Sequence, residues 1–117
     1  MKLSTREISH VTIVDITGRI TLGDETGQLR ETVANLIGQK KMKILLNLAG
    51  VDYIDSTGVG ELVSSFITVR NAGGDLKLLN LTPKVNDILN VTKLYTVLDI
   101  RDDEFTAIKS FDYFFAK

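Results

Sequence analysis

The chain has 117 residues, 44% of them hydrophobic and 25% charged, and its formal net charge is −1. This length suits one folded domain with its own core, so we predict a single domain over residues 1–117. Charges of both signs are scattered, which argues against a nucleic-acid partner because duplex binding needs a clustered basic face.

No apolar run approaches the roughly 20 residues that span a bilayer, and the N-terminal residues lack the apolar core of a signal peptide. The chain has no cysteine, which excludes disulfides, thiol catalysis and thiolate metal sites. We therefore expect a cytoplasmic protein that has no membrane partner.

The first two predicted elements are strands over residues 3–9 and 11–17, joined by a short turn at Ser9-His10. The second is rich in β-branched residues and Gly18 closes it, so we expect an antiparallel hairpin. His10 is the only histidine, and we interpret it as a solvated turn residue and not as a catalytic or metal-binding group.

A helix and a buried strand are predicted next. Asp24 is the expected N-cap of this helix and Gly38 ends it. Its apolar positions recur at helical spacing: Leu29, Val33, Leu36 and Ile37. Residues 43–48 then form an apolar run typical of a central strand covered on both faces, and Ala49-Gly50 is expected to turn the chain.

Residues 51–62 hold a changeover from strand to helix at Asp55-Ser56-Thr57-Gly58. The helix is expected to bury Val59, Leu62, Val63, Phe66 and Ile67, with Ser64, Ser65 and Thr68 on the other side. Free backbone N–H groups at a helix start suit an anion or a phosphoryl group. A purely structural interpretation stays open, in which Ser56 or Thr57 caps the helix and Gly58 and Gly60 allow close packing.

The C-terminal third continues the alternation. Residues 76–81 predict a strand, and Thr82-Pro83 a helix start with a capping hydroxyl. A short strand near residues 94–100 precedes a last helix, which is expected to dock on the sheet through Phe105, Ile108, Phe111 and Phe115. Strands alternating with helices predict an α/β domain: one open, mixed sheet with about four helices packed on it.

Catalytic motifs are absent from the sequence: it has no Walker-type loop, no Gly-x-Gly-x-x-Gly, no His-Glu-x-x-His and no Gly-x-Ser-x-Gly. We therefore predict no enzyme, no cofactor and no metal site. A phosphoaspartate receiver with Asp55 as acceptor fits the length, but a receiver needs an acidic pair after its first strand to hold Mg²⁺. Only Asp15 lies near that position.

The segment from Tyr53 to Gly60 resembles the signature of STAS-domain anti-sigma factor antagonists, the bacterial sporulation and general-stress type. Residues 44–48, Gly73-Gly74 and 81–83 extend the resemblance over nearly the whole chain. It implies a mixed sheet and no catalysis. It also implies that the protein binds an anti-sigma factor that is a Ser/Thr kinase, which frees a sigma factor. The kinase then phosphorylates the antagonist, and a PP2C-type phosphatase resets it.

The resemblance places the phosphoacceptor at Ser56, directly after Asp55, with Thr57 as a weaker candidate. The expected partner surface comprises Asp55, Ser56, Thr57, Gly58, Gly60, Glu61 and Asp24. Glu61 departs from the family pattern and is expected to stand near the phosphate, and residues 22–27 are unusually rich in glycine. A STAS scaffold subunit that is not phosphorylated, in a stress-signalling or lipid-transport complex, is the alternative.

Overall fold

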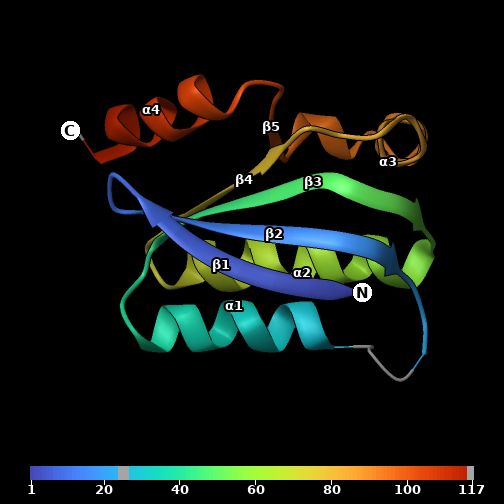
Figure 1. Cartoon of the computed structure of the whole chain (residues 1–117), viewed down its shortest axis with the longest axis horizontal. Coiled ribbons are helices and arrows are strands. Elements are labelled where there is room, and N and C mark those ends of the chain that lie inside the picture. Colours follow the sequence, from blue (N-terminus) through green and yellow to red (C-terminus); the bar gives the residue numbers. More distant parts are fainter. Residues whose placement is uncertain (24–26, 116–117) are drawn as a thin grey trace.

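The computed structural model describes residues 1–23 and 27–115, with the side chains of all of these except residues 113–115. Within this part of the chain, strands and helices alternate after an initial strand pair (Figure 1). The strands are β1 (Lys2–Ile8), β2 (Val11–Ile20), β3 (Lys43–Ile54), β4 (Asp75–Leu79) and β5 (Asp99–Arg101). The helices are α1 (Gln28–Gly38), α2 (Ser56–Asn71), α3 (Pro83–Val91), a 3₁₀ turn (Leu94–Thr96) and α4 (Glu104–Phe115).

The sheet is mixed, with strand order β1-β2-β3-β4-β5. β1 is antiparallel to β2, and each later strand is parallel to its neighbour. Ser9 and His10 form the predicted hairpin turn with φ of 52° and 66°, which is typical of the two-residue type I′ turn that suits twisted strands. The predicted α/β class and element order are thus confirmed.

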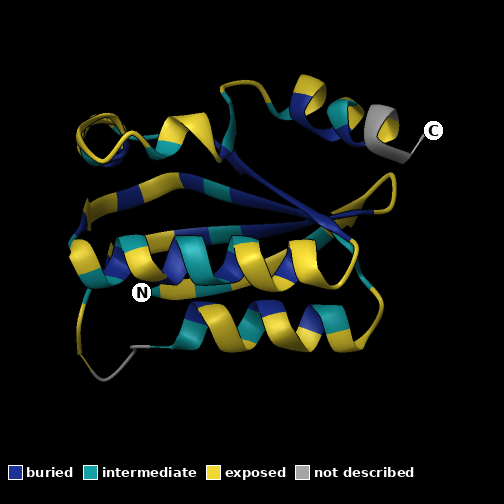
Figure 2. Cartoon of the chain, turned by 180° about the vertical axis from the view of Figure 1, so that it is seen from behind, coloured by how far each residue is buried: buried dark blue, intermediate teal, exposed yellow. Residues whose placement is uncertain are grey.

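Two helical layers enclose the sheet. α1 and α2 lie on one face, whereas α3 and α4 lie on the other (Figure 1). The middle strands are the most buried, and exposed residues lie on the outer sides of the helices, along β1 and in the loops (Figure 2). All five residues of β4 are buried, as expected for a parallel strand covered on both faces.

The predicted turn at Ala49-Gly50 is wrong, because β3 runs without interruption through both residues. Asp15 of β2 pairs with Asn47, but Thr17 pairs with Gly50, so β3 carries one extra residue between these two pairs. The extra residue makes a bulge, which bends a strand without ending it. A Cβ added at Gly50 would lie 2.6 Å from Thr17 Cγ2, so the bulge needs glycine.

The buried face of α2 also differs from the prediction. Its buried residues are Gly58, Glu61, Leu62, Ser65 and Val69. Ile67, which was expected to be buried, is 50% exposed. Two of the buried residues are small, so α2 packs closely on the sheet along a face that counting apolar residues does not single out.

Two helix starts differ from the prediction. α1 has Gly27, with φ of 91°, at its N-cap position; Asp24, the expected cap, lies outside the described residues. Thr82 precedes α3, but its hydroxyl does not cap the helix. It donates instead to the Val51 carbonyl at 2.8 Å, which ties the start of α3 to β3.

α4 docks on the sheet through Ala107, Ile108 and Phe111, which pack with Leu45 and Leu79. Phe105 is 66% exposed, so its predicted docking role is wrong, and the Phe115 side chain is not described.

α4 also covers the buried Lys77 of β4. The Lys77 ammonium donates to Ser110 Oγ at 2.7 Å. It lies 3.4 Å from an Asp99 carboxylate oxygen and 4.8 Å from the centre of the Phe111 ring.

Candidate functional site

The changeover from β3 to α2 is held by the carboxylate of Asp55. This residue has extended backbone geometry and is the N-cap of α2. Its Oδ1 accepts from the Gly58 N–H at 2.9 Å, and its Oδ2 accepts from the Leu22 N–H at 3.2 Å. Asp55 therefore performs the capping that the structural interpretation gave to Ser56 or Thr57, and it also fixes the segment after β2.

Ser56 is exposed at the first position of α2, and Thr57 beside it is partly buried. With Asp55 as the cap, the Ser56 hydroxyl makes no hydrogen bond to any residue that the structure describes. It projects from a helix start, where backbone N–H groups and the helix dipole favour negative charge.

Gly58 and Gly60 have different roles. A Cβ added at Gly58 would lie 2.0 Å from the Ile20 carbonyl oxygen and 2.6 Å from Ile54 Cγ1. Only glycine therefore fits between α2 and the ends of β2 and β3. A Cβ at Gly60 would meet nothing within 4 Å, so the predicted packing role of Gly60 is wrong and its backbone is open to a partner.

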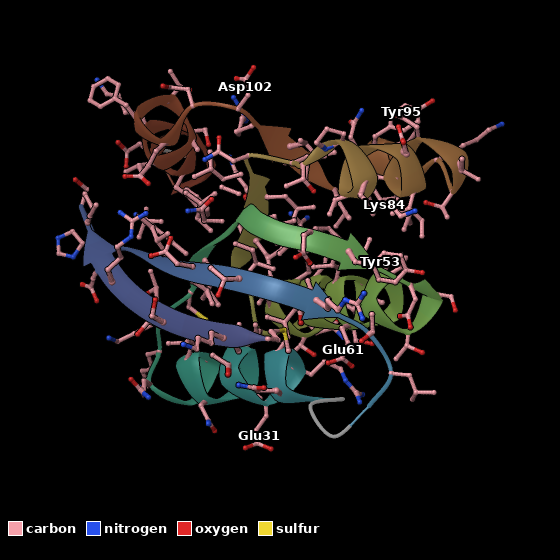
Figure 3. All side chains as sticks on the ribbon, turned by 45° about the vertical axis from the view of Figure 1, so that its right-hand side comes forward. Glu31, Tyr53, Glu61, Lys84, Tyr95 and Asp102 are labelled. Atoms are coloured by element: carbon pink, nitrogen blue, oxygen red, sulfur yellow. The ribbon has the colours of Figure 1, made fainter. Side chains whose placement is uncertain are left out.

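Glu61 does not face the Ser56 turn. Its side chain is only 7% exposed and lies 2.7 Å from the Nε of Arg30, whose own side chain is 51% exposed. A second Glu61 oxygen accepts from the Gly27 N–H at 3.0 Å. The carboxylate is thus fully engaged with α1 and the residue before it (Glu61 is labelled in Figure 3).

Removing the Arg30 charge is expected to destabilise the domain. Arg30→Met should lower the free energy of unfolding by about 1 to 2 kcal/mol, because the buried Glu61 carboxylate loses its cation while the Gly27 N–H remains. Urea unfolding measures this. Lys41→Met is the control: its partner Glu7 is 48% exposed, so its effect should stay below about 0.5 kcal/mol. An equal loss of unfolding free energy in Arg30→Met and Lys41→Met would contradict a stabilising role for the Arg30–Glu61 pair.

Asp55 also predicts a pH dependence. The Gly58 N–H holds the pKa of the Asp55 carboxyl below its ordinary value, and the Leu22 N–H acts in the same direction. A lowered folded-state pKa adds stability above the unfolded value of about 3.9, and this stability is lost as the pH falls through the folded value. The difference in urea midpoint between the unaltered domain and Asp55→Ala should therefore narrow from pH 7 towards pH 3. A constant difference would show that the ionised carboxylate is not the cap.

A groove of about 400 Å³ separates the Ser56 turn from α3. Tyr53, Asp55 and Ser56 line one side, and Lys84 and Val91 are among the α3 residues on the other. Tyr53 and Lys84 face one another between β3 and α3 (Figure 3), with the Lys84 ammonium 5.2 Å from the ring centre. Val91 is 83% exposed, so one wall of this groove is apolar and open.

The structure brings together most of the predicted site residues. Asp55, Ser56, Thr57, Gly58 and Gly60 lie together at the N-terminal end of α2, whereas Glu61 turns towards α1 and Asp24 lies outside the described residues. Sequence reasoning missed Lys84 and Arg30, because a lone lysine on a helix or a lone arginine carries no local signal of its partner.

Among the described residues, no group of three or more His, Cys, Asp or Glu side chains lies close enough to hold a metal ion. In the same part of the chain, no helix combines the length and the apolar character needed to cross a membrane.

The model of the STAS domain family matches residues 2–107. The chain belongs to the STAS domain family. The match takes in the whole sheet and the start of α4, so the resemblance inferred from the Tyr53–Gly60 segment is confirmed at the level of the family.

The STAS domain is similar to curated proteins. It is 36% identical to the anti-sigma-B factor antagonist of Bacillus subtilis over 72 residues, which is 62% of this chain and 65% of that protein. It is 26% identical to the anti-sigma F factor antagonist of Paenibacillus polymyxa, over 56% of each chain. The matched segments thus span less than two thirds of these relatives.

Solved structures share the fold. The Thermotoga maritima protein tm1081 superposes with a TM-score of 0.85 at 21% identity, over 93% of each chain. The Bacillus cell fate determinant SpoIIAA in its phosphorylated form gives a TM-score of 0.72 at 19% identity, over 93% of this chain and 98% of that one. At these identities the likeness concerns the fold.

Proposed function

We propose that this STAS domain is an anti-anti-sigma factor that acts by binding and not by catalysis. Its partner is an anti-sigma factor that is also a Ser/Thr kinase, and binding this partner frees a sigma factor. The proposal is supported by the names of its curated relatives and by the match of the family model. The contact surface centres on the exposed first turn of α2, with Ser56 and Gly60, and Asp55 holds the shape of that turn.

Phosphorylation of Ser56 is the proposed off-switch. The observation that carries it is an exposed hydroxyl at a helix start whose capping is already done by Asp55. The Ser56 oxygen attacks the γ-phosphorus of ATP, its proton passes to a base of the kinase, and ADP leaves. The phosphate adds about 1.5 to 2 negative charges. The helix start tolerates this charge, but a partner seated on the turn meets added bulk and repulsion.

The reset is a hydrolysis. Water attacks the phosphorus of phosphoserine 56 in a PP2C-type phosphatase, which releases inorganic phosphate and restores the hydroxyl. Binding, phosphorylation, release and dephosphorylation then form a cycle in which the STAS domain is the substrate and never the catalyst.

Intact mass spectrometry tests the switch. The STAS domain is incubated with the purified kinase partner and ATP, and a gain of one phosphate is expected on the unaltered chain but not on Ser56→Ala. Thr57→Ala is the matched control and should gain the phosphate. If no mass is gained, or if Ser56→Ala gains it equally, the unphosphorylated scaffold subunit becomes the better description.

A further inference from the structure

Two cations lie on the aromatic ring next to the proposed phosphoacceptor. The guanidinium carbon of Arg19 is 5.4 Å from the centre of the Tyr53 ring, and the ammonium of Lys84 is 5.2 Å from it. Neither cation forms an ion pair with a described residue. The other four arginines each lie within ion-pair distance of a carboxylate: Arg6, Arg30, Arg70 and Arg101. As far as the described residues show, no carboxylate holds the two charges beside Tyr53, which leaves them able to meet a new anion.

Of these two cations, only Lys84 lines the groove that holds Ser56, as far as the described residues show. The groove also contains two carboxylates, Asp55 and Asp87. Both oxygens of the Asp55 carboxylate already accept hydrogen bonds from backbone N–H groups. A phosphate on Ser56 would thus enter a space with two negative groups and one mobile cation. Lysine suits this role because its flexible stem lets a compact charge move several ångströms.

We propose that Lys84 receives the phosphoryl group of Ser56: its ammonium leaves the Tyr53 ring and pairs with the phosphate oxygens across the groove. This inference rests on the proposed function, because it needs a phosphate at Ser56. The pair links the start of α2 to α3 and covers the apolar wall that includes Val91. Phosphorylation then removes a partner surface in addition to adding charge.

Phosphorus NMR tests the contact without any kinase. Phosphoserine is installed at position 56 during translation, and its second ionisation is followed from pH 4 to pH 8. A nearby cation favours the dianion, so the titration midpoint should lie below the value of about 6 for free phosphoserine. In Lys84→Gln the midpoint should rise by about half a unit or more.

Two variants make the test specific. Lys109 lies over the Phe105 ring at 4.9 Å, on α4, so Lys109→Gln removes a similar lysine away from Ser56 and should leave the midpoint unchanged. Arg19→Gln should leave it unchanged as well. Equal midpoints in the unaltered domain and Lys84→Gln would overturn the proposal, and so would a larger shift in Arg19→Gln. Failure of the kinase to label Ser56 would count against the proposed function alone, since here the phosphate is installed directly.

Discussion

Replacing Ser56 with alanine is expected to lock the domain onto its kinase partner. The variant lacks the acceptor hydroxyl, so ATP cannot drive its release, while the Asp55 cap and the rest of the turn are kept. In size-exclusion chromatography with ATP present, Ser56→Ala should stay in the complex and the unaltered domain should leave it. Release should be lost completely and not in part, because the Ser56 hydroxyl oxygen is the atom that accepts the phosphate.

Ser56→Asp should act in the opposite sense. A carboxylate at this position imitates part of the phosphate charge, so its affinity for the partner should fall at least tenfold, about 1.4 kcal/mol. Isothermal titration calorimetry without ATP measures the binding of Ser56→Ala, Ser56→Asp and Thr57→Asp. The last variant carries the same charge one residue further along and should bind more tightly than Ser56→Asp. Equal affinity of Ser56→Asp and the unaltered domain would argue against a charge switch at Ser56.

Gly58→Ala is expected to be the most destabilising small substitution in the site. Its methyl group would stand 2.0 Å from the Ile20 carbonyl oxygen. That atom is backbone in β2, so relief requires α2 to move away from the sheet. The cost should be about 3 kcal/mol, which is roughly 10 °C in melting temperature for a domain of this size. Calorimetry and urea unfolding measure both quantities.

Gly60→Ala is the matched control for this substitution. It lies two residues further along the same helix, where an added Cβ meets nothing within 4 Å. Because alanine favours helix over glycine, the free energy of unfolding should rise by up to about 1 kcal/mol. The same chemical change is thus expected to have opposite signs at neighbouring glycines. If both Gly58→Ala and Gly60→Ala lowered the free energy of unfolding, the packing of α2 on the sheet would not be what distinguishes the two glycines.

The sequence predicts the order and type of the elements because its apolar periods are clear and several of its turns carry glycine or proline. It does not predict the continuity of β3. Ala49-Gly50 has the composition of a turn, and only pairing with β2 turns it into a bulge. It also misplaces Ile67 on α2, because periodicity weighs hydrophobicity and ignores the small size that lets Gly58 and Ser65 approach the sheet.

For the candidate site, the sequence predicts the turn at Asp55 and Ser56 but not the residues that surround it in the fold. Asp55 and Ser56 are neighbours in the chain, so a local motif captures both. Lys84 comes from a different helix, and its proximity to Tyr53 depends on how α3 packs on β3. Glu61 shows the converse: a charge near the start of α2 suggests a surface role until Arg30 and Gly27 are seen to bind it.

The burial of Lys77 under α4 has a consequence for the order of events during protein synthesis. The ammonium and its apolar surroundings, Leu45 and Leu79, are covered by Ala107, Ile108 and Phe111. This helix follows all five strands of the sheet in the sequence. A growing chain therefore exposes the part of the sheet around Lys77, Leu45 and Leu79 until α4 has left the ribosome. Packing of this part of the sheet is complete only then, and until then its exposed apolar surface makes the incomplete chain prone to aggregation.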